Sequence, residues 1–180
     1  MKKITLTIFI LLIFSSLSTA QFLNSNIGAY LGIGSIKGRS TAQTSFAANL
    51  FYDFQVPFIS DASFRLNYLH SRKVEYFLPE NRKGKYYPFI HAISLKAFIN
   101  QSLSELFYVE EGAGLVAVND RTFSDTNVWD YGIAFNLLGG IDLRLLNKGF
   151  KLGAGIEYGI TFNNTTASYF SFHLQSQFYF

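Results

Sequence analysis

The chain ends on "FSFHLQSQFYF", residues Phe170 to Phe180, and apolar and polar side chains alternate to its last residue. Side chains two positions apart lie on the same face of a β-strand. Chain termini are usually frayed and polar, so this ending predicts a strand that is paired over its whole length. One face carries Phe170, Phe172, Leu174, Phe178 and Phe180, and the other carries Ser171, His173, Gln175 and Gln177.

The same alternation occurs in "YGIAFNLLGGIDLRL" (Tyr131–Leu145) and "FKLGAGIEYGITF" (Phe150–Phe162). Weaker copies upstream bring the expected total to about eight strands. The fifth strand is irregular, because adjacent Glu110 and Glu111 place one carboxylate on the apolar face unless a bulge intervenes. The five upstream strands are predicted near Asn26–Ile36, Thr44–Gln55, Ala62–Arg72, Pro88–Ile99 and Glu105–Val118.

The first residues read as an export signal. "MKK" is a basic start, Ile4–Phe14 is an apolar run, and Ser18 and Ala20 fit the positions that a signal peptidase reads. The run is too short to span about 30 Å of hydrocarbon. We therefore expect a cleaved signal peptide over residues 1–20, export through the Sec pathway, and one domain over residues 21–180.

Composition narrows the function classes. Removing Lys2 and Lys3 from 15 basic residues leaves 13 against 12 acidic ones, so the exported chain carries +1 and nucleic acid is not expected as a partner. The absence of cysteine excludes disulfides, thiolate chemistry and a cysteine-linked lipid anchor. Charged residues make up 15% and aromatic residues 18%, against about 25% charged residues in typical soluble domains.

Two features predict that the apolar face meets lipid. The polar face is rich in glycine, which suits a narrow lumen better than a solvated surface. Aromatic residues also gather near strand ends, as at the two interfaces of a bilayer. A soluble periplasmic lipocalin-like barrel or sandwich is the alternative. The aromatic residues fall into two expected girdles, Tyr52, Phe54, Phe107, Tyr108, Phe150 and Phe178 at one rim and Tyr68, Phe89, Trp129, Tyr131, Phe162 and Tyr169 at the other.

Short and longer connections alternate along the chain, as in an up-and-down barrel of an outer membrane. With this pattern and its C-terminal Phe, the chain resembles the small outer-membrane β-barrel proteins of Gram-negative bacteria, of the OmpA/OmpX transmembrane type. The resemblance implies an eight-stranded antiparallel barrel, outer-membrane location, lipid and lipopolysaccharide contacts, a monomer, and a role in envelope integrity or surface interaction. It also implies recognition by the barrel assembly machinery through Phe172, Leu174, Phe178 and Phe180.

The polar face predicts either a catalytic or transport site, or a network of ion pairs that fills the lumen. Buried charges need partners, and a barrel of about eight strands has no open pore, so the network is preferred over a small channel. Ser171 and His173 share a face with Glu157 across strands, but such spacing arises easily by chance. We expect no metal, cofactor or catalytic site. The predicted network contains Asp53, Arg65, Lys96, Asp142, Arg144, Glu157, His173 and Gln175.

The last part of the chain is also similar to outer-membrane lipid A deacylases. That family carries a His-x-Ser-Asn stretch after a Gly-x-x-Tyr strand, whereas "GIEYGITFNN" places Ile160 and Phe162 at the His and Ser positions. Only Asn163 matches, and no acidic residue follows Glu157. The resemblance therefore implies a deacylase-like barrel that has lost its chemistry.

A basic segment follows the third predicted strand. If it faces outward, its cations are candidates for pairing with lipopolysaccharide phosphates, and an ordinary solvated loop is the alternative. His70 and His91 occupy positions otherwise apolar near the same rim, where interfacial side chains are expected. The candidate lipopolysaccharide contacts are Arg72, Lys73, Arg82, Lys83 and Lys85.

Overall fold

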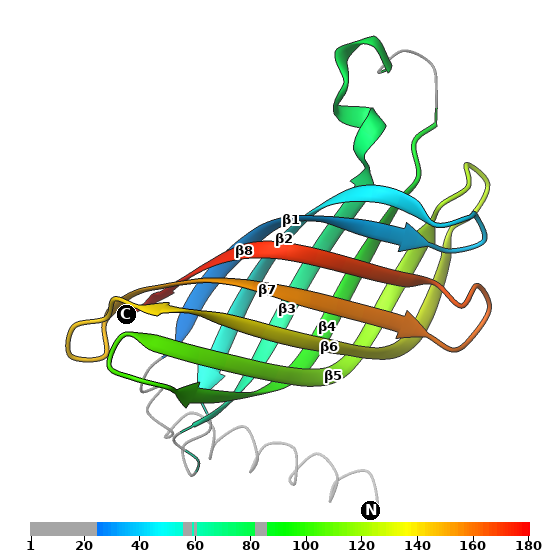
Figure 1. Cartoon of the computed structure of the whole chain (residues 1–180). Coiled ribbons are helices and arrows are strands. Elements are labelled where there is room, and N and C mark those ends of the chain that lie inside the picture. Colours follow the sequence, from blue (N-terminus) through cyan, green and yellow to red (C-terminus); the bar gives the residue numbers. More distant parts are fainter. Residues whose placement is uncertain (1–24, 56–58, 60, 82–85) are drawn as a thin grey trace, which may run out of the picture.

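The C-terminal strand closes a barrel (Figure 1). The computed structural model describes residues 25–55, 59, 61–81 and 86–180, so the expected signal peptide lies outside the described residues. Each strand pairs antiparallel with the next in chain order, which confirms the predicted eight-stranded up-and-down fold. The strands are β1 (Asn26–Lys37), β2 (Gln43–Gln55), β3 (Ala62–Lys73), β4 (Phe89–Ser102), β5 (Phe107–Arg121), β6 (Val128–Asp142), β7 (Gly149–Thr161) and β8 (Ser168–Tyr179).

Pairing of β1 with β8 explains the ordered C-terminus. The register runs from Asn26 opposite Tyr179 to Lys37 opposite Ser168, so β8 is paired over its whole length. β7 pairs with the other edge of β8, from Gly149 opposite Tyr179 to Ile160 opposite Ser168. An unpaired strand edge in hydrocarbon leaves several backbone groups without partners, and the closed seam removes that cost.

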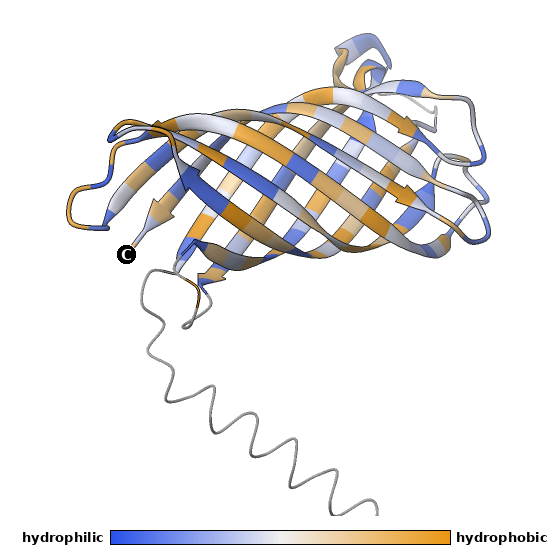
Figure 2. Ribbon diagram, turned by 60° about the horizontal axis from the view of Figure 1, so that its bottom comes forward, coloured by the Kyte–Doolittle hydropathy of each residue, from blue (hydrophilic) through white to orange (hydrophobic). Residues whose placement is uncertain are grey.

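The wall of the barrel has an apolar outer face. Leu115, Leu174 and Leu31 are 71%, 67% and 58% exposed, which is unfavourable in water but suits contact with lipid. Figure 2 shows hydrophobic and hydrophilic positions alternating along the strands. The strands are 12 to 15 residues long, and about 9–11 tilted residues cross the hydrocarbon core. The strands therefore extend beyond the core of a bilayer.

The two ends of the barrel differ. One end, called the terminal end below, holds Asn26, Tyr179 and the connections 56–61, 103–106 and 143–148. The other, the loop end, holds the connections 38–42, 74–88, 122–127 and 162–167. Residues 74–81 form two short 3₁₀ helices, η1 (Val74–Phe77) and η2 (Pro79–Asn81), that rise away from the rim (Figure 1). No helix in the described part of the chain is long and apolar enough to cross a membrane.

The predicted contrast between short and long connections is only partly right. At the loop end, 38–42, 122–127 and 162–167 are as short as the connections at the terminal end. Only 74–88 is long. Short turns are possible because buried carboxylates accept their backbone N–H groups: Asp120 accepts from Thr122 at 2.8 Å, and Asp130 accepts from Thr165 at 2.7 Å.

Strand β5 is regular rather than bulged. Its pairing with β6 is continuous from Phe107 opposite Ile141 to Asp120 opposite Val128. Glu110 consequently lies inside, fully buried, and Glu111 lies on the outer face. Two residues of the predicted aromatic girdles do not lie at the outer rims. Tyr108 on β5 and Tyr169 on β8 point inward and are 1% and 2% exposed.

Candidate functional site

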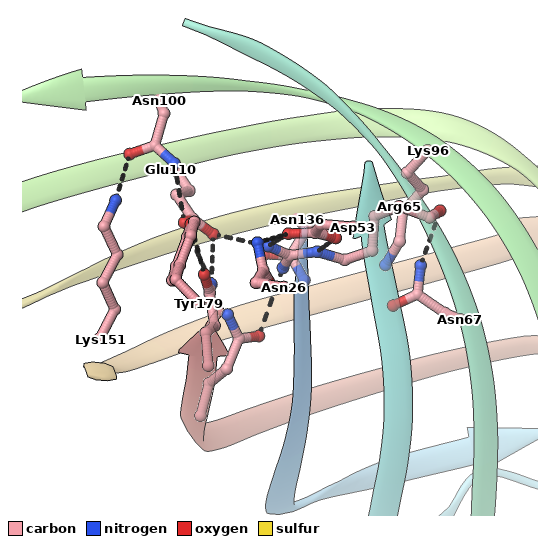
Figure 3. A network of polar contacts seen from close by, with 12 residues as sticks. Asn26, Asp53, Arg65, Asn67, Lys96, Asn100, Glu110, Asn136, Lys151 and Tyr179 are labelled. Carbon is pink, nitrogen blue, oxygen red and sulfur yellow. Dashed lines mark hydrogen bonds and ion pairs between the residues drawn. The ribbon is translucent and has the colours of Figure 1, made fainter. Parts of the chain in front are cut away.

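The lumen contains a first cluster of charges around Arg65 of β3 (Figure 3). Its Nε donates to Asp53 Oδ1 at 2.6 Å and its Nη2 donates to Asp53 Oδ2 at 2.7 Å, a two-pronged contact with the neighbouring strand β2. Nη2 also lies 2.9 Å from Glu110 Oε2 on β5. The guanidinium lies 4.2 Å from the Phe51 ring centre and 3.9 Å from that of Phe98. These contacts hold a fully buried cation in one place.

Glu110 extends this cluster toward the terminal end. Its two oxygens accept hydrogen bonds from the Gln177 amide at 3.0 and 2.9 Å, and Asn100 donates to Oε1 at 3.0 Å. Lys151 in turn donates to Asn100 Oδ1 at 3.0 Å (Figure 3). The Arg65 cluster, comprising Asp53, Arg65, Asn100, Glu110, Lys151 and Gln177, thus connects β2, β3, β4, β5, β7 and β8 across the lumen.

A second cluster surrounds Glu157 of β7. Lys96 Nζ lies 2.9 Å from Glu157 Oε2, and both side chains are at most 1% exposed. The Tyr30 hydroxyl donates to Oε2 at 2.9 Å, and the Tyr169 hydroxyl donates to Oε1 at 2.8 Å. Asn136 donates to Oε2 at 3.3 Å. Within the described residues, this carboxylate is the only ion-pair partner of Lys96 Nζ.

Charges of the two clusters balance. Asp53, Glu110 and Glu157 supply three buried carboxylates, and Arg65, Lys96 and Lys151 supply three buried cations. Balance of this kind is required in a buried lumen, because an unpaired charge there is strongly unfavourable. Gln175 lies between the clusters and accepts from Arg65 Nη1 at 3.5 Å.

His173 and Ser171 lie next to the Glu157 cluster without forming a relay to it. The His173 ring stacks on Tyr30 with centroids 3.9 Å apart, and Ser171 Oγ lies 3.4 Å from His173 Nδ1. Both residues are 1% exposed. The carboxylate of Glu157 is occupied by Lys96, Asn136 and two tyrosines, so no hydrogen bond orients His173 from an acid in the way a Ser-His-Asp triad requires.

Asp142 and Arg144, both predicted on the polar face, lie together at the terminal end of the lumen, but only Asp142 belongs to a strand. β6 ends at Asp142, so Arg144 lies in the connection 143–148, with Leu146 and Asn147 at φ of 52° and 68°. Its guanidinium pairs with Asp142 at 2.6 Å. Burial favours the neutral form, yet the hydrogen bonds to Asp142 hold the pKa of Arg144 above its ordinary value. Arg144 also lines a polar cavity of about 180 Å³ at the terminal end, together with Asn100, Lys151 and Tyr179.

Two of the five predicted lipopolysaccharide contacts lie within the described residues. The Arg72 guanidinium lies 3.9 Å from the Tyr76 ring centre and 4.9 Å from that of Phe89. Lys73 pairs with Glu75 at 3.0 Å on the surface. Arg82, Lys83 and Lys85 lie outside the described residues. The C-terminal residues Phe172, Leu174, Phe178 and Phe180 are on the outer face or rim, and each is at least 39% exposed.

Several lumen residues were not predicted. Tyr30, Glu110, Lys151 and Tyr169 are as central to the clusters as the predicted residues. The alternation of apolar and polar side chains could have indicated Tyr30 and Lys151, because each lies on the glycine-rich face of its strand. Within residues 25–55, 59, 61–81 and 86–180, no group of three or more His, Asp or Glu side chains is placed to hold a metal ion.

No protein-family model matches this sequence, and no curated protein matches it either. Solved structures do match. Neisserial surface protein A aligns with a TM-score of 0.64 and 10% identity over 87% of this chain and 97% of its own. The fold is that of an outer-membrane β-barrel. With the apolar outer wall, it confirms the outer-membrane location expected from the sequence.

Two further structures share the fold. Ail, the attachment invasion locus protein of Yersinia pestis, aligns with a TM-score of 0.51 and 13% identity over 89% of this chain and all of its own. The N-terminal barrel domain of Pseudomonas aeruginosa OprF aligns with a TM-score of 0.50 and 16% identity over the same shares. Ail has also been crystallised with the heparin analogue sucrose octasulfate, in a structure that aligns with a TM-score of 0.55 and 12% identity over 87% of this chain and 98% of its own.

Proposed function

We propose that this protein is a non-enzymatic outer-membrane barrel whose lumen is closed by side chains and which acts through its outer surfaces, in envelope integrity or surface interaction. One observation carries the proposal. Arg65 on β3 reaches partners on β2, β5 and β8, so its side chain occupies the centre of the lumen. A barrel filled in this way leaves the outer wall and the loops as its working surfaces.

Conductance measurements test the closed lumen. Reconstituted in a planar bilayer, the protein is expected to give no steady ion current. Arg65→Ala removes the side chain that joins opposite walls and is expected to admit water and ions, so it serves as the positive control. A steady current through the unsubstituted barrel would show that the clusters do not close the lumen.

The proposed absence of a catalytic role is supported by the burial and the existing contacts of the polar lumen residues. Ser171 and His173 are buried inside the barrel, where the His173 ring stacks on Tyr30, and the Glu157 carboxylate already accepts four contacts. At the positions where lipid A deacylases carry His and Ser, Ile160 and Phe162 lie on the outer face as apolar side chains. Incubation of the folded protein with lipid A is therefore expected to release no fatty acid.

We infer that the loop end faces the exterior, since outer-membrane barrels place their longer loops there. The segment 74–88 and the adjoining end of β3 are then the principal surface of contact. Its proposed partners for lipopolysaccharide phosphates are Arg72, Lys73, Arg82, Lys83 and Lys85. The rings of Tyr76 and Phe77 pack edge to face with their centroids 5.6 Å apart, and the rings of Phe77 and Phe46 of β2 have centroids 5.4 Å apart. The base of the segment is therefore fixed to the barrel.

Shortening this segment tests the surface role. Residues 75–86 are replaced by a turn as short as the other connections, and a matched control carries substitutions in 143–148 at the opposite end. The loop variant is expected to keep a folded barrel but to weaken either the barrier to hydrophobic dyes or the attachment of cells to anionic surfaces. Unchanged barrier and attachment in a folded loop variant would contradict the proposal.

Biogenesis is proposed to follow the sequence signals. Cleavage after Ala20 leaves a chain beginning at Gln21, and the barrel assembly machinery reads the last strand through Phe172, Leu174, Phe178 and Phe180. The barrel is proposed to be a monomer. The intact mass of protein extracted from outer membranes tests the cleavage site directly, because retention of residues 1–20 would give a larger mass.

A further inference from the structure

A second polar feature lies on the outer wall of the barrel, which is otherwise apolar. The outer patch, as it is called here, consists of His70, Arg72, Phe89, His91 and Arg121. The register places Arg72 opposite Phe89 and Phe89 opposite Arg121, which makes one row across β3, β4 and β5. His70 and His91 are paired in the next row toward the middle of the barrel. Two arginine and two histidine side chains therefore gather in two adjacent rows near the loop end.

The arginines of the outer patch have no acidic partner. None of the ion pairs found among the described residues includes Arg72 or Arg121. Arg72 lies against the rings of Tyr76 and Phe89, and its buried Nε has no hydrogen-bond partner in the described part of the chain. Arg121 donates from Nε to the Asn119 side chain at 3.3 Å. Both guanidinium groups keep donors for an additional acceptor.

Nearby carboxylates do not neutralise the outer patch. Glu75 is paired with Lys73 at 3.0 Å. Asp120 lies on the lumen face of β5, opposite to the face that carries Arg121, and accepts hydrogen bonds from the backbone N–H groups of Arg39 and Thr122. Asp125 lies in the connection 122–127 rather than on the wall. The outer patch is therefore a local positive site at the height where the wall meets lipid head groups.

An apolar groove begins directly below the outer patch. It has a volume of about 280 Å³ and is lined by Leu66, Ile93, Leu95, Leu115, Ala117 and Tyr131. The register places Ile93, Ala117 and Tyr131 in the row that follows His91, Asn119 and Trp129. Ala117 is the small residue between two large ones, and its missing side-chain volume makes the hollow. The groove runs along the wall away from the loop end.

We propose that the outer patch and the groove together bind one phosphate-bearing membrane lipid. Its phosphate is held by Arg72 and Arg121, and part of an acyl chain lies over Ala117 between Ile93 and Tyr131. Arginine suits this role because its planar donors match phosphate oxygens. A soluble phosphate has no apolar part that could occupy the groove, whereas a lipid has one. The groove also opens on the lipid-facing wall. The proposal rests on the membrane location, and it assigns to Arg72, already proposed as a lipopolysaccharide contact, a specific lipid site on the wall that uses Arg121 and the groove.

The chain carries its own reporter for this site. Trp129 is the single tryptophan, is 45% exposed, and lies opposite Asn119 in the row of His91, next to the row where the groove begins. Bromine atoms on an acyl chain quench tryptophan emission only at short range. The folded barrel is placed in phosphatidylcholine vesicles that contain a small fraction of brominated phosphatidic acid or, separately, the same fraction of brominated phosphatidylcholine. Stronger quenching by brominated phosphatidic acid is the expected result.

Three variants and one control locate the effect. Each of Arg72→Gln and Arg121→Gln is expected to lower the preference for phosphatidic acid by about fivefold at low salt. Lys37→Gln is the matched control, because Lys37 is an exposed outer-face cation at the loop end on β1. Ala117→Phe fills the groove and is expected to reduce quenching by both lipids. Heat-dependent gel mobility establishes that each variant is folded.

Several results would overturn the proposal. Equal quenching by the two lipids would show that the outer patch does not select an anionic head group. An equal loss in Lys37→Gln would assign the preference to general surface charge. Loss of the preference on adding inorganic phosphate at a matched ionic strength would identify a site for the free anion rather than for a lipid. Unchanged quenching in a folded Ala117→Phe variant would show that the acyl chain does not lie in the groove.

Discussion

Arg65 on β3 and Glu110 on β5 meet inside the barrel at 2.9 Å, although β4 lies between their strands. The contact therefore spans the lumen rather than following the wall. Both side chains are at most 2% exposed, and each has further partners, Asp53 for Arg65 and Gln177 for Glu110. One cation and two carboxylates from β2, β3 and β5 are thus joined inside the barrel.

Removing Arg65 is expected to be strongly destabilising. Arg65→Met leaves Asp53 and Glu110 buried without their cation, and breaking a buried pair in this way costs about 3–5 kcal/mol. The measurement is urea unfolding of the vesicle-embedded barrel, followed by the fluorescence of Trp129.

Lys73→Met is the control for this substitution. Its pair with Glu75 is on the surface, with side chains 27% and 54% exposed, so its loss is expected to change the free energy of unfolding by less than about 1 kcal/mol. If the two variants unfolded at the same urea concentration, the Arg65 cluster would have no special part in stability.

The pair of Lys96 and Glu157 predicts an asymmetry. Glu157→Gln leaves Lys96 buried without an ion-pair partner in the described structure, whereas Lys96→Met leaves Glu157 with hydrogen bonds from Tyr30, Asn136 and Tyr169. Glu157→Gln is therefore expected to be the more destabilising variant, by about 1–3 kcal/mol relative to Lys96→Met.

The double variant completes this test. Lys96→Met combined with Glu157→Gln removes both charges, so it is expected to be more stable than Glu157→Gln alone. Equilibrium unfolding of the three variants measures the coupling. Additive effects would mean that the two side chains do not interact as the geometry indicates.

Two glycines provide a matched comparison of packing. A Cβ on Gly159 would lie 2.2 Å from Tyr169 Cε1, so Gly159→Ala must displace the ring that donates to Glu157. A Cβ on Gly139 would have its nearest neighbour at 3.8 Å. We expect Gly159→Ala to cost about 1–3 kcal/mol in unfolding free energy and Gly139→Ala to be nearly neutral. Equal stability of the two variants would contradict the packing described for Tyr169.

Two truncations at the C-terminus separate the closure of the barrel by β8 from recognition of the last strand by the assembly machinery. Deleting residues 176–180 leaves the start of β1 without its partner strand, so the heat-resistant folded form is expected to disappear. Deleting Phe180 alone removes a residue beyond the end of β8, so the purified chain is expected to refold normally. If Phe180 is part of the assembly signal, the same deletion lowers the amount of barrel in cells.

The alternation of side chains was enough to predict the eight strands and the inward position of Arg65, Lys96 and Glu157. Their partners could not be predicted, because contacts across the lumen depend on how far each strand is shifted against the next. The position of Arg144 depended on where β6 ends, and that is decided by the turn at Leu146 and Asn147. The outer patch was visible only as two isolated histidines, since its arginines come from strands that the register brings together.

The central claim, that the apolar wall faces lipid and the charged face is enclosed, can be tested by single cysteines because the chain has none. Leu115→Cys lies on the outer wall, Gln175→Cys in the lumen, and Asp125→Cys in an exposed connection. In native membranes, a water-soluble maleimide is expected to label Asp125→Cys rapidly and the other two slowly. Labelling of Leu115→Cys as fast as that of Asp125→Cys would place the apolar wall in water and contradict the account.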